Sequence, residues 1–232
     1  MTLLTQIQEV AGSLNLPQPS AVVGNTDPDV VLWLNLAKRE GRELFRRHDW
    51  QKLVVEHTQT TLATVAQTAL PTAYDHFGPD VEIWNRTTNT KYVGPVASNE
   101  WMRLNTGISG GVAGWWRLIG GALNIYPAPT AGETIALEYV SKNWCQSSVL
   151  VGQSTWAADS DVGILSEELM ALGVTWRWLR AKGMDYAEEM ATYEREVEKA
   201  AARDRGLKIR VVGKSREEDY PPYPFWNGTI NA

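Results

Sequence analysis

The amino-acid sequence predicts an α+β protein: a four-helix bundle split in the sequence, an inserted small antiparallel β-sandwich or barrel, and an extended C-terminal arm. Apolar residues recur at helical spacing near both ends of the chain, short β-prone runs fill the middle, and prolines alternate with aromatic rings at the C-terminus. We therefore expect a discontinuous helical bundle at residues 1–50 and 161–205. The β domain is expected at 51–160 and the docking arm at 206–232.

The two ends of the chain carry the stripe of a helix that buries one face. Apolar or small residues recur at i, i+4, i+7, i+11 and i+14 within residues 30–44, and the same spacing returns in 165–179 and 186–200. A shorter apolar pattern in residues 2–14 predicts a fourth helix. Gly41 lies on a buried stripe, where the absence of a side chain permits a close helix crossing.

Capping signals predict where these helices begin and end. Asp27 stands before Pro28, a side chain that accepts hydrogen bonds at a helix start followed by a residue suited to the first helical position. Gly183 predicts a left-handed turn that ends one helix, and Asp185 can cap the next. Gly206 predicts the end of the last helix.

The middle of the chain predicts short strands rather than helices. Its β-prone runs are separated by Gly, Pro and Asn, and Gly120-Gly121 between two of them is a two-residue hairpin signal. This number of short strands is typical of a small antiparallel sandwich or barrel. The expected strands cover residues 53–57, 81–84, 91–93, 115–119, 122–126 and 134–140.

Composition limits the possible function classes. The net charge of −5 argues against a conventional nucleic-acid binder, which presents a basic face. No apolar stretch is long enough to span a bilayer and no signal peptide begins the chain, so we expect no membrane insertion and no secretory route. Cys145 is the single cysteine, which excludes an intrachain disulfide and suits a reducing compartment.

Tryptophan is unusually frequent, with eleven residues against three phenylalanines. A tryptophan ring offers a large apolar surface and one N–H donor, so it serves both cores and interfaces. For any single tryptophan we expect a place in the core. For the set as a whole we expect some use at an interface.

One string has the form of a catalytic motif. Residues 107–111 read G-x-S-x-G, the turn that exposes the nucleophile of α/β-hydrolases. In that fold the acid and the histidine follow the serine, whereas His48, His57 and His76 all precede Ser109. We therefore interpret the string as a flexible glycine-rich loop.

No other pattern predicts chemistry. The histidines and the cysteine lack the spacing of metal ligands. The acid pairs Glu167/Glu168 and Glu188/Glu189 fall at expected helix starts, where they complement the helix dipole. Phosphate-binding and dinucleotide motifs are absent. We predict that the chain is not an enzyme and uses neither a metal nor a cofactor.

The C-terminal arm is the most informative segment. A basic run within residues 205–216 precedes three acids and then the string Tyr-Pro-Pro-Tyr-Pro-Phe-Trp at 220–226. Prolines favour an extended segment, which cannot bury its own aromatic rings, so we expect another chain to receive them. The alternative is that the arm folds back on its own domain or frays. The expected portal-binding residues are Arg210, Lys214, Arg216, Tyr220, Pro221, Pro222, Tyr223, Pro224, Phe225 and Trp226.

Several short strings together resemble a known family, the head-to-tail adaptors of tailed double-stranded DNA phages, also called tail tubular or tail accessory proteins. The resemblance covers roughly residues 1–205. The strings that carry it are Asp27-Pro28, Glu40-Gly41-Arg42-Glu43-Leu44, Asp49-Trp50, Leu70-Pro71, Gly94-Pro95, Glu100-Trp101, Ile125-Tyr126-Pro127-Ala128-Pro129, Glu138-Tyr139-Val140-Ser141, Trp176-Arg177-Trp178 and Gly183-Met184-Asp185-Tyr186-Ala187.

The resemblance implies a structural virion protein at the head–tail junction, assembled in the host cytoplasm. Members form a ring, usually of twelve copies, beneath the portal protein. Their C-terminal arms bind the portal, and the opposite end receives a tail nozzle, tail tube or tail-fibre protein. Double-stranded DNA passes through the lumen without specific binding.

A ring needs a heterologous contact between two different faces of neighbouring subunits. The candidates are Arg42, Arg46 and Arg47 on one predicted helix and Glu189 and Glu194 on another, with simple solvated faces as the alternative. The acidic balance favours a lumen of net negative charge, along which DNA can slide, while the basic run contacts protein.

Two other functions remain open from the sequence. One is a cell-wall (peptidoglycan) hydrolase of the tail, which requires a carboxylate pair facing across a cleft. The other is a module that binds glycans or tail fibres through exposed tryptophans in residues 51–160.

Overall fold

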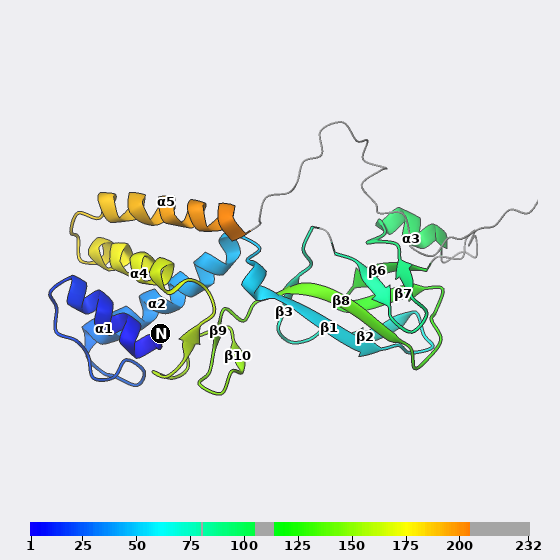
Figure 1. The fold of residues 1–232 in the computed structure, drawn as a ribbon, viewed down its shortest axis with the longest axis horizontal. Coiled ribbons are helices and arrows are strands. Elements are labelled where there is room, and N and C mark those ends of the chain that lie inside the picture. The colour runs from blue at the N-terminus through cyan, green and yellow to red at the C-terminus, as the bar shows by residue number, and fades with distance from the viewer. Residues whose placement is uncertain (80, 105–113, 205–232) are drawn as a thin grey trace, which may run out of the picture.

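The computed structural model describes residues 1–79, 81–104 and 114–204. The protein is a mixed α+β structure whose long helices and main sheets occupy opposite ends of the molecule (Figure 1). We call residues 1–50 and 142–204 the helical lobe and the described part of residues 51–141 the β lobe. The arm predicted after residue 205 and the glycine-rich string at 107–111 lie outside the described residues.

Four long helices form the helical lobe, at the positions that the apolar stripes predict. Helix α4 contacts each of the other three, so it is central to their packing. The chain leaves this lobe after α2 and returns before α4, so the lobe is discontinuous in sequence (Figure 1). The helices are α1 (Leu3–Ser13), α2 (Pro28–Arg47), α4 (Glu167–Ala181) and α5 (Ala187–Asp204).

The capping predictions at Asp27 and Gly183 are confirmed. The Asp185 side chain accepts a hydrogen bond from the backbone N–H of Ala187 at 3.1 Å at the start of α5, and Gly206 lies outside the described residues. The Asp27 side chain accepts a hydrogen bond from the backbone N–H of Asp29 at 2.8 Å, which caps the start of α2. Gly183 adopts a φ of 71° after α4, and the N–H of Met184 donates to the carbonyl of Leu179 at 3.0 Å. This Schellman arrangement needs the left-handed conformation that glycine adopts most easily.

The β lobe consists of antiparallel strands in two sheets. A five-stranded sheet has the order β1-β8-β4-β5 with β3 also paired to β8, and a three-stranded sheet has the order β2-β7-β6. Each predicted strand is found within a few residues of its expected position. The strands are β1 (Val54–Thr60), β2 (Ala66–Ala69), β3 (Tyr74–His76), β4 (Ile83–Asn85), β5 (Thr90–Tyr92), β6 (Trp115–Ile119), β7 (Ala122–Tyr126) and β8 (Thr134–Ser141).

The two sheets share one apolar cluster. Ile135 and Leu137 on β8 pack with Trp116 on β6 and with Leu123 and Ile125 on β7. Among the described strands no sheet closes on itself, so the barrel alternative is wrong. The predicted hairpin between β6 and β7 is confirmed: Gly120 and Gly121 have φ of 59° and 79°, as a two-residue turn with two left-handed positions requires.

Several short elements were not predicted from the sequence, including β2 and β3 of the β lobe. Helix α3 (Ser98–Leu104) covers part of the β lobe through Trp101 and Leu104. In the helical lobe, β9 (Cys145–Gln146), β10 (Gly152–Gln153) and β11 (Val162–Gly163) form a small sheet against the helices. A single turn of 3₁₀ helix (Gln51–Leu53) also precedes β1.

Tryptophan mostly builds the core, as we expect for any single residue. Eight of the ten described tryptophans are buried, and Trp33 stacks on Trp178 with ring centroids 5.1 Å apart. The close approach that Gly41 permits is made by the ring of Trp144, which a side chain at this position would overlap. Trp84 is the described tryptophan with an exposed ring.

Polar contacts join the two lobes at the end of α5. One oxygen of the Asp204 carboxylate accepts a hydrogen bond from the backbone N–H of Gln51 at 2.8 Å and lies 3.3 Å from Nε2 of His48. Nearby, His76 of the β lobe contacts the Asp49 carboxylate at 3.0 Å. Because Asp204 is held here, the described part of the chain ends at the junction of the lobes.

Candidate functional site: interaction surfaces

The five predicted subunit-interface residues occupy different environments on α2 and α5. Arg47 and Glu194 bind each other within one chain, with N–O distances of 2.5 and 2.8 Å. Arg42 and Arg46 are exposed, and the Arg42 side chain donates to the backbone carbonyl of Lys38 one turn away. Glu189 is half-buried in the first turn of α5. Among the described residues, Arg42 and Arg46 are therefore the cations of this set that form no ion pair with a carboxylate.

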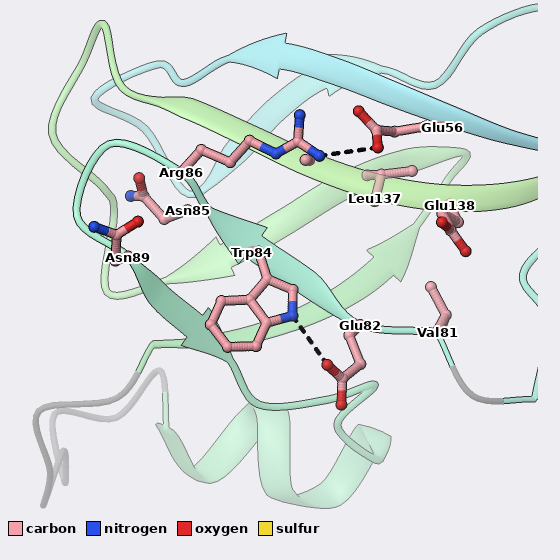
Figure 2. A pocket seen from close by; sticks show the side chains of 10 residues that line it. Glu56, Val81, Glu82, Trp84, Asn85, Arg86, Asn89, Leu137 and Glu138 are labelled. Atoms are coloured by element: carbon pink, nitrogen blue, oxygen red, sulfur yellow. Dashed lines mark hydrogen bonds and ion pairs between the residues drawn. The ribbon is translucent and has the colours of Figure 1, made fainter. Parts of the chain in front are cut away.

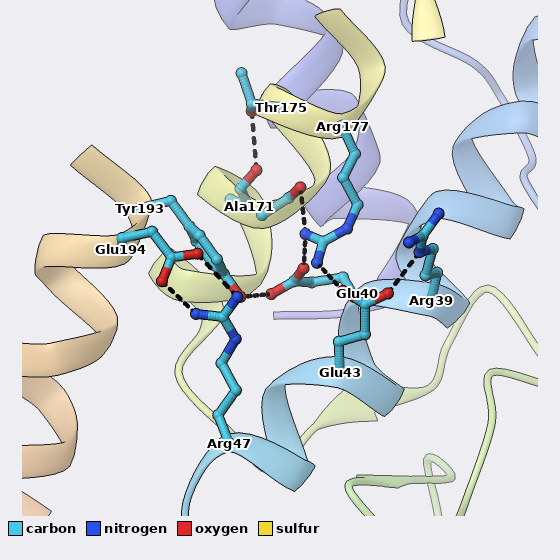
Figure 3. Close-up of polar contacts among 10 residues, drawn as sticks. Arg39, Glu40, Glu43, Arg47, Ala171, Thr175, Arg177, Tyr193 and Glu194 are labelled. Atoms are coloured by element: carbon cyan, nitrogen blue, oxygen red, sulfur yellow. Dashed lines mark hydrogen bonds and ion pairs between the residues drawn. The ribbon is translucent and has the colours of Figure 1, made fainter. Parts of the chain in front are cut away.

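Behind this surface, a buried polar cluster connects α2, α4 and α5 (Figure 3). The fully buried Glu40 carboxylate forms an ion pair with the Arg177 guanidinium and accepts a hydrogen bond from the Tyr193 hydroxyl at 2.7 Å. Arg177 also contacts Glu43 at 2.6 Å, and Glu43 contacts the exposed Arg39 at 2.5 Å. Gly173 allows the approach, since a side chain there would overlap the Glu40 carboxylate.

Burial controls protonation in this cluster. Removal from water raises the pKa of Glu40 to about 7, although Arg177 and Tyr193 act in the opposite direction. Burial and the neighbouring Glu40 charge likewise raise the pKa of Tyr193. Shifted pKa values are frequent at catalytic sites, but the Glu40 carboxylate is fully buried and bound by its neighbours. We therefore assign this cluster to fixing the helices.

Sequence reasoning missed the role of Glu40 and Arg177. Glu40 lies three residues after the buried Ala37 and four before the buried Leu44, so a charged residue stands in an apolar row. Arg177 lies likewise between the buried Trp176 and Trp178. A charge at a core position is the signal that could have identified the pair.

In the β lobe, the outward face of the five-stranded sheet has a hollow of about 480 Å³ (Figure 2). Glu56 on β1 and Glu138 on β8 lie directly opposite each other and line it. Like charges in that position disfavour pairing, and Arg86 offsets them by contacting Glu56 at 2.9 Å. Trp84 forms one wall, and its indole N–H donates to Glu82 at 2.9 Å.

A larger hollow of about 960 Å³ lies along β5, which ends this sheet. We call it the β5 groove, defined by Trp84, Tyr92, Val93, Pro127 and Pro129 among its lining residues. Rings and prolines give it a mainly apolar wall. Val93 is 49% exposed at its rim. Such a groove suits an apolar segment of another protein chain.

The described residues include no cluster of potential metal ligands. Within residues 1–79, 81–104 and 114–204, no three His, Cys, Asp or Glu side chains gather closely enough to hold a metal ion. The pKa of Glu82 is lowered, first by its hydrogen bond from Lys91. The general acid of a glycoside hydrolase needs the opposite, a carboxyl group in a cleft with a raised pKa, so Glu82 does not fit that role.

The predicted portal-binding residues of the arm and Ser109 both lie outside the described residues. Of the helices in the described part of the chain, none combines the length and apolarity of a bilayer span.

Comparison with known proteins agrees with a role in interaction. The family model described as SU10 adaptor protein matches residues 1–221, which includes the basic run of the arm and extends beyond the resemblance seen in the sequence. No curated protein matched the chain. The family comprises structural head–tail adaptors of phages, which are located in the virion and contact other head and tail proteins. Because the match covers most of its length, the chain belongs to the SU10 adaptor protein family.

Proposed function

We propose that this protein forms a ring of twelve copies that joins the portal vertex to the tail and lines the DNA conduit. The observation that carries the proposal is the family match over residues 1–221. The proposal keeps the division predicted from the sequence into a helical bundle at 1–50 and 161–205, an inserted β domain at 51–160 and a docking arm at 206–232, although Trp144, Cys145 and Trp156 pack with the helices.

The arm is the proposed portal-binding element. Its aromatic and proline residues suit an extended segment that becomes ordered on a partner, where the rings act as anchors. Because Asp204 is fixed between the lobes, every arm in a ring starts from the same place on its subunit. The opposite end of the ring would receive a tail nozzle, tail tube or tail-fibre protein.

The test mixes the purified protein with portal rings and follows assembly by light scattering. We expect a rise in mass for the full chain and none for a chain lacking residues 206–232. Circular dichroism of the truncated chain should retain its helical and β signals, since the described lobes end at Asp204. Equal binding by the truncated chain would show that the arm is not the anchor.

The proposal also concerns the lumen. With a net charge of −5, the ring should present a negative bore, from which DNA is weakly repelled and along which it slides. The basic run at 205–216 should contact protein. A structure of the assembled ring with a basic bore would contradict this part of the proposal.

One observation favours a second candidate, a module that binds glycans. Trp84 is 37% exposed and lines the same hollow as the carboxylates of Glu82, Glu56 and Glu138 (Figure 2). Sugar-binding sites commonly combine an aromatic ring, on which the sugar stacks, with oxygens that accept hydrogen bonds from its hydroxyl groups. Binding of host-surface polysaccharide by the full chain, lost in Trp84→Ala, would support it. Unchanged binding in this variant would exclude Trp84 from such a site.

A further inference from the structure

The loop between β9 and β10 presents three consecutive apolar side chains to solvent. Val149, Leu150 and Val151 are 76%, 75% and 60% exposed. Elsewhere in residues 1–79, 81–104 and 114–204, large apolar residues that are exposed occur singly along the chain. We call these three residues the apolar tip. A continuous exposed apolar surface of this kind marks a site of interaction.

The loop has a defined shape. Ser147 holds it: its N–H donates to the carbonyl of Val151 at 2.9 Å, and its carbonyl accepts from the N–H of Leu150 at 2.9 Å. The base of the hairpin is fixed in the helical lobe, because Trp144 and Cys145 are fully buried there. The apolar tip therefore projects from a firm support.

Leu150 adopts an unfavourable backbone conformation. Its φ of 62° lies in the left-handed region, at the last position of a three-residue hairpin loop where glycine is usual. A leucine at this position costs stability that glycine or asparagine would not. Strained residues of this type persist only where the surrounding structure holds them, and they cluster at functional sites. Here the strained position carries a leucine whose side chain is exposed to solvent.

The same chain offers a receptor of matching chemistry. The β5 groove is mainly apolar, with Trp84, Tyr92, Pro127 and Pro129 in its wall. Its volume of about 960 Å³ exceeds that of three aliphatic side chains. The apolar tip belongs to the helical lobe and the groove to the β lobe, so they are different surfaces of one subunit. A heterologous contact between successive subunits requires two such surfaces.

We propose that the apolar tip of one subunit inserts into the β5 groove of the next copy of this chain. This contact would form the interface between neighbouring subunits of the ring, so the proposal rests on the proposed function. It is apolar, and it adds to any contribution from the exposed Arg42 and Arg46. Leu150, at the centre of the tip, acts as the anchor of the contact.

Disulfide cross-linking tests the geometry directly. A Leu150→Cys chain is mixed with a Val93→Cys chain under mild oxidation, and products are separated by non-reducing electrophoresis. The native Cys145 should not form cross-links, because its thiol is fully buried and burial raises its pKa to about 12. We expect a cross-linked dimer from the mixture. Met184→Cys, 53% exposed on the helical lobe, replaces Leu150→Cys as the matched control and should give none with Val93→Cys.

A second variant separates interface loss from misfolding. Leu150→Asn keeps a residue that tolerates the left-handed conformation but removes the apolar anchor. We expect self-association, measured by sedimentation velocity over a range of concentrations, to weaken roughly tenfold or more. The melting temperature of the single chain should rise by about 2–4 °C as strain is relieved. Ile119→Asn, 45% exposed in the β lobe, should leave association unchanged.

The outcomes distinguish this contact from the proposed function. Absence of the cross-link in portal-bound assemblies, or wild-type association of Leu150→Asn, overturns the contact while portal binding through the arm stands. A cross-link that forms in protein unable to bind portal rings supports the contact and rejects the adaptor role.

Discussion

The Glu40 carboxylate lies against the Arg177 guanidinium, although 137 positions separate the two residues in the chain. Both side chains are buried, and the Tyr193 hydroxyl completes the cluster from α5. One set of polar contacts thereby links helices that precede and follow the β lobe (Figure 3). These contacts fix how α2, α4 and α5 pack.

Breaking this pair should strongly destabilise the protein. Arg177→Met leaves the Glu40 carboxylate buried without its partner, so we expect a loss of about 3–5 kcal/mol in the free energy of unfolding at pH 8. Urea denaturation followed by circular dichroism measures it. The matched control is Arg39→Met, which removes an exposed ion pair with Glu43 and should cost less than about 1 kcal/mol. Equal losses in the two variants would contradict the role of the buried pair.

Stability should decrease as pH rises from about 5 to 8. Between the ordinary pKa of a glutamate and the folded value of about 7, the folded protein retains a proton on Glu40 that the unfolded chain has released. The stabilisation from this group is therefore complete below pH 4.5 and is lost as pH rises through 7, by up to about 3 kcal/mol. Urea midpoints across this range measure the slope. Glu40→Gln should flatten it, and an unchanged slope in that variant would refute the assignment.

Gly173→Ala should also destabilise the helical lobe. The added methyl group would overlap the Glu40 carboxylate, which cannot retreat because Arg177 and Tyr193 hold it. We expect a loss of about 1–3 kcal/mol in thermal or urea unfolding. Gly78→Ala is the control, because no atom lies within 4 Å of its added methyl group. A neutral Gly173→Ala would show that α2 and α4 can separate without cost.

The charged residues of α2 should differ in what they support. Arg42→Glu with Arg46→Glu changes two exposed cations, so we expect unchanged unfolding but weaker, more salt-sensitive assembly on portal rings. Arg47→Ala removes the ion pair with Glu194 and should cost about 1 kcal/mol of stability. Light scattering and urea unfolding together separate the effects. Normal assembly of the double variant would remove Arg42 and Arg46 from the interface.

Local patterns predicted the regular elements well. The start of α2 at Asp27-Pro28, the turn at Gly183 and the hairpin at Gly120-Gly121 depend on neighbouring residues, which a sequence displays directly. Strands β9, β10 and β11 have two residues each, which is too short for a detectable alternation of apolar and polar residues. Helix α3 is similarly too short for a clear apolar period.

The interaction surfaces were less accessible from sequence. Arg47 and Glu194 were predicted as partners across a ring contact because each lies on a charged helix face, but the 147 positions between them conceal their contact within one chain. Exposure is likewise a tertiary property, so the sequence did not distinguish the open ring of Trp84 from the eight buried tryptophans. The apolar tip was missed because Val149–Val151 resembles an ordinary core strand.

The insertion between α2 and α4 has a consequence for biosynthesis. As the chain leaves the ribosome, α1 and α2 emerge first, but α4, which contacts both, follows only after roughly 120 further residues, a delay of about 6–24 s at ordinary translation rates. The β lobe is complete within that interval and can fold on its own local pairings. The nascent α1 and α2 must meanwhile keep their apolar stripes from aggregating, which makes this interval the time at which a chaperone would act.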